Sequence, residues 1–172
     1  MSAKAKGSQY QGLEFEENER AIRRDWRFER IGRMLLALIL LAAIAGLLGR
    51  GPLAKARTTS RSGALTLDYE RIERRVAETH LRFSVAPGAV TDTLVRLWID
   101  RRWLEEVRLE QVVPEPIATR ETGTALVYEF AATRGAPAVV TFDYQHEGQG
   151  RLPGSAGLVG ADSLRFAQFV LP

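Results

Sequence analysis

Two histidines and a few serines are the side chains of this 172-residue sequence that could do acid–base or nucleophilic chemistry. His146 ends an alternating strand pattern and is followed by a glutamate, the pairing that a general base uses. The candidate serines are Ser84, Ser155 and Ser163, but no Gly-x-Ser-x-Gly motif surrounds any of them. His80 falls on the polar face of its predicted strand, where it is solvated. We therefore predict no catalytic residue, with a hydrolase built on His146, a carboxylate and a serine as the alternative.

The composition excludes several classes of site. The chain has no cysteine, which rules out disulfides, thiol nucleophiles and cysteine-based zinc sites. Two histidines cannot build a three-histidine metal site. The glycine-rich segment 146–162 is followed by a strand-like sequence rather than the helix and lysine that a phosphate loop needs. We predict no metal and no cofactor.

The densest charged patch that also carries an aromatic side chain is the segment 100–108, DRRWLEEVR. It joins two predicted strands, so it lies at one end of the domain, where binding functions usually reside. Arginine and tryptophan are common at the centres of protein interfaces. The long loop predicted over 146–162 is typical of a functional surface and carries apolar side chains. The predicted partner-binding residues are Arg101, Arg102, Trp103, Leu152 and Leu158.

The elements that must position these residues are strands. Apolar and polar residues alternate over 65–69, 79–85, 107–113, 126–130, 140–144 and 164–170, and the segment 93–100 is apolar on both faces, as a central strand is. Glycine and proline lie between these segments. About seven strands in residues 64–172 favour an all-β, Ig-like β-sandwich. The stretch 72–78 fits either a helical turn or a strand. Trp98 lies in a segment that is apolar on both faces and is predicted to be a core residue.

An apolar run precedes this domain. Met34–Gly49 contains sixteen residues without a charge, and with the three residues before it spans roughly 28 Å as a helix. The sequence predicts a disordered tail over 1–12, a charged juxtamembrane helix over 13–33, a transmembrane helix over 34–49 and a linker over 50–63. Trp26, Arg30 and Arg33 are expected at the membrane interface.

The flanking charges give an orientation and a compartment. Six arginines precede the run and four cations follow it, which places the N-terminus in the cytoplasm. The β domain is then periplasmic, and the lipid bilayer of a bacterial inner membrane is the first partner. Residues 63–172 contain 12 arginines and 15 acidic residues, so we expect no nucleic-acid binding. A second possibility is a soluble exported ligand-binding module, released by cleavage after Ala56 in the small-x-small sequence 54–56.

Several segments together carry a resemblance: RRDWRFERIGR before the apolar run, then GPL, LDYERIERR, VVPEP and the terminal FAQFVLP. In these segments the chain resembles uncharacterised bitopic proteins of bacterial inner membranes. The layout is also similar to that of the copper chaperones of cytochrome oxidase assembly, but their cysteine motif is missing here. The resemblance implies a single span and an exported β domain, and no activity. We expect a non-enzymatic membrane protein whose β domain binds or positions a partner, as an accessory subunit of a membrane or envelope complex.

Overall fold

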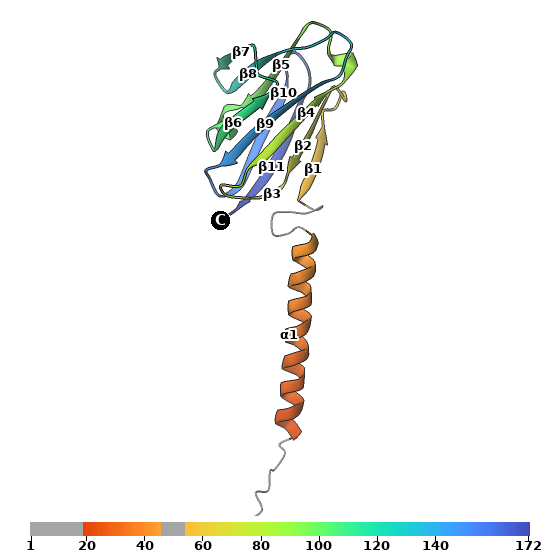
Figure 1. Cartoon of the computed structure of the whole chain (residues 1–172), viewed down its shortest axis with the longest axis vertical. Helices are drawn as coiled ribbons and strands as arrows, with labels where there is room; N and C mark the ends of the chain where they lie inside the picture. The colour runs from red at the N-terminus through yellow and green to blue at the C-terminus, as the bar shows by residue number, and fades with distance from the viewer. Residues whose placement is uncertain (1–18, 46–53) are drawn as a thin grey trace, which may run out of the picture. The chain divides into compact units, whose positions relative to one another are not determined.

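A computed structural model describes residues 19–45 and 54–172 of the chain (Figure 1). Contacts divide the protein into two compact units, Met1–Leu40 and Leu41–Pro172, so the N-terminal helix and the β domain are described separately. The predicted tail over 1–12 and the start of the predicted juxtamembrane helix lie outside the described residues. The same is true of residues 46–53, which hold the end of the apolar run and the start of the predicted linker.

The N-terminal helix α1 (Glu19–Ala45) is continuous through the charged segment and the first twelve residues of the apolar run. Its large apolar side chains between Ile31 and Ile44 are 53–69% exposed. Within the part of the chain that the structure describes, no helix is both long and apolar enough to cross a membrane. The structure therefore does not support the transmembrane helix predicted over 34–49. Glu29, Arg30 and Arg33 lie within α1 and lower its mean hydropathy.

The β domain is built from two sheets of five and six strands within residues 54–172 (Figure 1). Sheet A has the order β1 (Lys55–Thr59), β2 (Leu65–Glu70), β4 (Thr79–Val85), β9 (Ala138–His146) and β6 (Val107–Val113). Sheet B has the order β3 (Ile72–Arg74), β11 (Ser163–Leu171), β10 (Gly150–Leu158), β5 (Leu94–Asp100), β8 (Ala125–Ala131) and β7 (Ala118–Thr122). All neighbouring strands are antiparallel except β3 and β11. The all-β, sandwich-like prediction is confirmed, but these strands exceed the seven of an Ig-like domain.

The core lies between the sheets because alternate side chains of each strand point inward. Leu65 and Leu67 of β2 and Leu81 and Phe83 of β4 are fully buried, as the alternation predicts. The largest fully buried side chain is Trp103, which the sequence placed on the surface. The prediction that Trp98 is a core residue is wrong. Trp98 is only half-buried, because it is directed to the outer face of β5 while its neighbours Leu97 and Ile99 are directed inward.

The glycine-rich segment predicted as a loop over 146–162 instead contains β10, paired between β11 and β5. Its glycines allow close approach of aromatic rings. A Cβ atom on Gly154 would lie 2.5 Å from the Phe166 ring, and one on Gly157 would lie 2.8 Å from Nε1 of Trp98. Glycine is therefore required in this strand by packing on both of its faces.

Strand β1 lies in the segment predicted as a linker, so the domain begins before Ala64. Its five residues are mostly polar and pair with β2 at the edge of sheet A, where the outer face meets water. Strand β3 resolves the ambiguous stretch 72–78 as a short strand followed by a turn. Strand β7 is almost entirely exposed and pairs only with β8, which explains why no apolar alternation marks it.

Candidate functional site

The predicted binding segment folds as a single helical turn, α2 (Arg101–Leu104), between β5 and β6. Asp100 caps the helix, because its Oδ1 accepts a hydrogen bond from the backbone N–H of Arg102 at 3.0 Å. Arg101 also donates a hydrogen bond from its Nε to Oε1 of Glu105, four residues later, at 2.9 Å. This local structure directs Trp103 into the core and leaves Arg101 and Arg102 exposed.

Two neighbouring hollows of the β domain meet beside α2. One, of about 350 Å³, extends over the start of β10 and reaches Leu152, Pro153 and Arg165. The other, of about 550 Å³, extends over β5 toward Trp98 and the turn at Thr124. We call the combined depression the α2 groove. The residues common to both hollows are Asp100, Arg102 and Ser155.

The charged side chains of the α2 groove differ in whether they have a partner. Arg101 is paired with Glu105 and Glu121, and the hydrogen bond that it donates to Glu105 raises the pKa of its guanidinium. Asp100 accepts a hydrogen bond from Ser155 at 3.3 Å. Arg102 and Arg165, in contrast, form no ion pair within 4.0 Å in the residues that the structure describes. The groove thus presents cations that can receive a carboxylate.

The structure brings together most of the predicted partner-binding residues. Arg101, Arg102 and Leu152 line the α2 groove. Trp103 lies beneath it and is only 1% exposed, so its ring belongs to the core rather than to a contact surface. Leu158 is also buried, at the far end of β10, and is not part of this surface. Trp98 and Arg165 were not predicted to belong to this site, because their side chains join the groove only through the pairing of β5, β10 and β11.

The three residues predicted at a membrane interface lie on α1. The guanidinium carbon of Arg30 is 5.4 Å from the centre of the Trp26 ring, a cation–π distance. Arg33 pairs with Glu29 at 3.7 Å, one helical turn earlier. Both contacts are formed within the helix and are exposed, so they contribute little to its stability.

A buried polar cluster fills one end of the sandwich, and it includes His146. Nε2 of His146 lies 2.7 Å from Oε2 of Glu73, although the two groups are not aligned as a hydrogen bond. The other carboxylate oxygen, Oε1 of Glu73, accepts hydrogen bonds from the Tyr144 hydroxyl at 3.1 Å and from Nε2 of Gln168 at 2.5 Å. Gln168 in turn accepts a hydrogen bond from Nε1 of Trp103 at 3.0 Å. His146 is only 1% exposed, although it is the last residue of its strand.

Burial raises the pKa of Tyr144 well above its ordinary value, and the nearby Glu73 carboxylate adds to the effect. Burial also raises the pKa of Tyr128. The folded protein therefore holds these phenol protons at a pH where the unfolded chain releases them. By linkage, their contribution to stability is complete below about pH 10 and is lost as pH rises toward the folded-state values.

We predict that the unfolding temperature of the protein falls as pH rises above about 10. Lys55 is the only lysine in residues 54–172, and arginines keep their charge, so few other groups titrate in this range. Thermal unfolding monitored by circular dichroism at a series of alkaline pH values checks this. Tyr144→Phe should flatten the dependence, and an unchanged slope in that variant would contradict the assignment.

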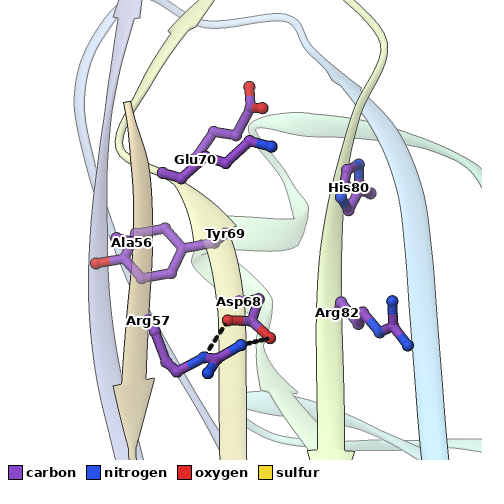
Figure 2. Close-up of a pocket in the computed structure, with 8 residues that line it drawn as sticks. Ala56, Arg57, Asp68, Tyr69, Glu70, His80 and Arg82 are labelled. Atoms are coloured by element: carbon purple, nitrogen blue, oxygen red, sulfur yellow. Dashed lines mark hydrogen bonds and ion pairs between the residues drawn. The ribbon is translucent and has the colours of Figure 1, made fainter. Parts of the chain in front are cut away.

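A second groove crosses the outer face of sheet A (Figure 2). Figure 2 shows the Arg57 guanidinium of β1 facing the Asp68 carboxylate of β2, with nitrogen–oxygen distances of 2.5 and 3.1 Å. The hydrogen bond that Arg57 donates to Asp68 raises the pKa of Arg57. His80 and Arg82 extend from the neighbouring strand β4. Opposite charges on adjacent strands are typical of a solvated sheet face, and His80 is exposed as predicted.

The residues that could do chemistry are kept apart. Among residues 19–45 and 54–172, neither ring nitrogen of His146 has a hydrogen-bond partner, and the Ser155 hydroxyl donates to Asp100. In the described residues no group of three or more histidine, aspartate or glutamate side chains could hold a metal. No known protein family matches the chain, and no curated protein is significantly similar to it.

Proposed function

We propose that the protein is a non-enzymatic accessory subunit of a bacterial inner-membrane or envelope complex, and that its β domain binds a partner protein at the α2 groove. The observation that carries this is the meeting of two hollows at Arg102, with Trp98 at one end and Leu152 and Pro153 at the other. An aromatic side chain, apolar contacts and arginines together are characteristic of interface centres.

The groove also supports a partner of particular chemistry. Arg102 and Arg165 have no ion pair within 4.0 Å in residues 19–45 and 54–172, so each can pair with a carboxylate. Trp98, half-buried over Gly157, offers a flat apolar surface beside them. We expect an extended protein segment that carries acidic and apolar side chains.

Attachment to the membrane and a periplasmic location for the β domain are part of the same proposal. They are supported by the sixteen uncharged residues Met34–Gly49 and by the excess of arginines before them. The exposed apolar side chains of α1 are consistent with a lipid environment. Recovery of the chain in the membrane fraction after cell lysis tests this part.

The partner site is tested by reversing one charge in it. Arg102→Glu should reduce recovery of a stoichiometric partner from detergent-solubilised membranes by about tenfold or more, because an interface arginine commonly contributes 2 kcal/mol or more. The matched control is Arg134→Glu, which reverses an equally exposed arginine in the turn between β8 and β9. Equal loss in both variants, or in neither, would contradict a site at the α2 groove.

Two structural observations bear on the other functions considered. A hydrolase using His146 needs that imidazole at the surface, but it is enclosed by Glu73, Tyr144 and Trp103. Release of a soluble module by cleavage after Ala56 would remove the first two residues of β1, one of which, Ala56, is buried opposite Tyr69. Binding at the α2 groove requires neither exposure of His146 nor removal of residues from β1.

A further inference from the structure

The two ends of the β domain differ in charge. Backbone hydrogen bonds define one end: Arg71 N–H donates to Ala54 O, Arg75 N–H to Leu171 O, and Val76 N–H to His146 O. We call this the β3 end, and Figure 1 shows β3 there beside the C-terminal end of β11. Its exposed cations are Lys55, Arg71, Arg74, Arg75 and Arg151. The carboxylates on its connections are Glu70, Glu78 and Glu147, the last of which pairs with Arg108.

The opposite end shows no such excess. It is formed by the connections 60–64, 86–93, 114–117, 132–137 and 159–162, and includes a hydrogen bond from Ser62 N–H to Asp162. It carries Arg61 and Arg134 against Asp92, Glu115 and Asp162. Positive charge is therefore concentrated at one end of a domain whose residues 63–172 are acidic in sum.

Apolar side chains are exposed among the cations of the β3 end. Val76 is 63% exposed in the turn after β3, directly after Arg74 and Arg75. Its φ of 64° is rare for a β-branched residue and costs conformational energy, so the turn presents this side chain at a local energetic cost. Phe169, 49% exposed on the outer face of β11, lies between Ile72 of β3 and Arg151 of β10.

We propose that the β3 end docks onto an anionic lipid surface, with its arginines on the head groups and Val76 and Phe169 in the interfacial layer. Anionic leaflets attract clusters of arginine and lysine, and apolar side chains beside them add to binding. The chain also enters the domain at this end, since β1 begins with Lys55, six positions after the apolar run ends at Gly49. The inference rests on the proposed membrane attachment for its location, and on the charge and apolar exposure for its chemistry.

The full-length chain provides a direct test because it has no cysteine. A fluorescent probe on Val76→Cys reports the β3 end, and the same probe on Thr133→Cys reports the opposite end. Each labelled protein is added to vesicles of phosphatidylcholine, alone or with phosphatidylglycerol, that contain nitroxide-labelled lipid. We expect quenching at position 76 only with the anionic lipid, reduced in 1 M salt, where the Debye length is about 3 Å.

Charge reversal supplies the second variant. Arg71→Glu together with Arg75→Glu should lower the docking equilibrium constant by about 25-fold or more, at roughly fivefold for each cation. The control pair Arg61→Glu and Arg134→Glu changes the net charge equally at the opposite end and should leave quenching at position 76 unchanged. Flotation with neutral vesicles reports attachment through the apolar run separately. Equal quenching at both positions, or quenching at position 76 that does not depend on anionic lipid, would overturn docking even where the chain floats.

Discussion

Trp103→Ala is expected to lower the free energy of unfolding by about 3–5 kcal/mol, the cost of deleting a buried tryptophan and leaving a cavity. The Trp103 ring is enclosed by Tyr144 and Phe166, with ring centres 5.0 and 5.6 Å away. Its removal also leaves Oε1 of Gln168 without the donor that now lies 3.0 Å from it. Urea unfolding of the full-length chain, followed by far-ultraviolet circular dichroism, measures the change.

Trp98→Ala is the matched control for this prediction. The Trp98 side chain is half-buried on the outer face of sheet B and packs over Gly157, so its deletion leaves no enclosed cavity. We expect a loss below about 2 kcal/mol, the scale of partial side-chain burial. A larger effect at Trp98 than at Trp103 would mean that the core is not where the structure places it.

The burial of Trp103 also affects how the partner site can be tested. A double substitution of Arg102 and Trp103 would also destabilise the core, so loss of a partner would not separate the surface from the fold. Arg102 is exposed, and only its backbone N–H is used in capping α2, so its side chain can be changed alone.

Strands with a strict apolar alternation could be predicted from the sequence. The predicted ranges 79–85 and 107–113 coincide with β4 and β6, because one face of each strand packs on the core and the other meets water. The edge strands β1 and β7 were not predicted, because they bury almost no apolar side chain. Strand β10 was predicted as a loop because of its glycines, which are needed there for close packing against Trp98 and Phe166.

The candidate site was predictable only in part. Arg101, Arg102 and Leu152 were identified from local composition, since arginine next to an aromatic residue is a local signal. Which of two tryptophans enters the core depends on the cap at Asp100 and the single turn of α2, and this was not read from the segment. The pairing of Glu73 with His146 joins residues 73 positions apart through β3 and β9, so no spacing in the sequence could indicate it.

The second prediction with a large expected effect concerns the Glu73–His146 pair. From the sequence alone, His146 has no predicted catalytic role, and His146→Ala is expected to have little effect on the protein. The structure reverses this expectation, because both side chains are buried and Nε2 of His146 lies 2.7 Å from Oε2 of Glu73. Removing one member leaves the other buried without its partner, so His146→Leu and Glu73→Met should each lower the free energy of unfolding by about 3–5 kcal/mol.

The double variant separates the pair's coupling from simple loss of packing. With both polar groups replaced by apolar ones of similar size, no buried polar group is left without its partner, and such replacements are often close to neutral. The Tyr144 hydroxyl loses its acceptor on Glu73 but keeps its contact with Nε2 of Gln168 at 2.6 Å, which limits the remaining cost. We therefore expect the double variant to lose less than the sum of the single losses by about 2 kcal/mol or more, within the range of contacting pairs. Additive losses in urea unfolding would show that Glu73 and His146 are not energetically coupled, and that the cluster stabilises this end of the sandwich through packing alone.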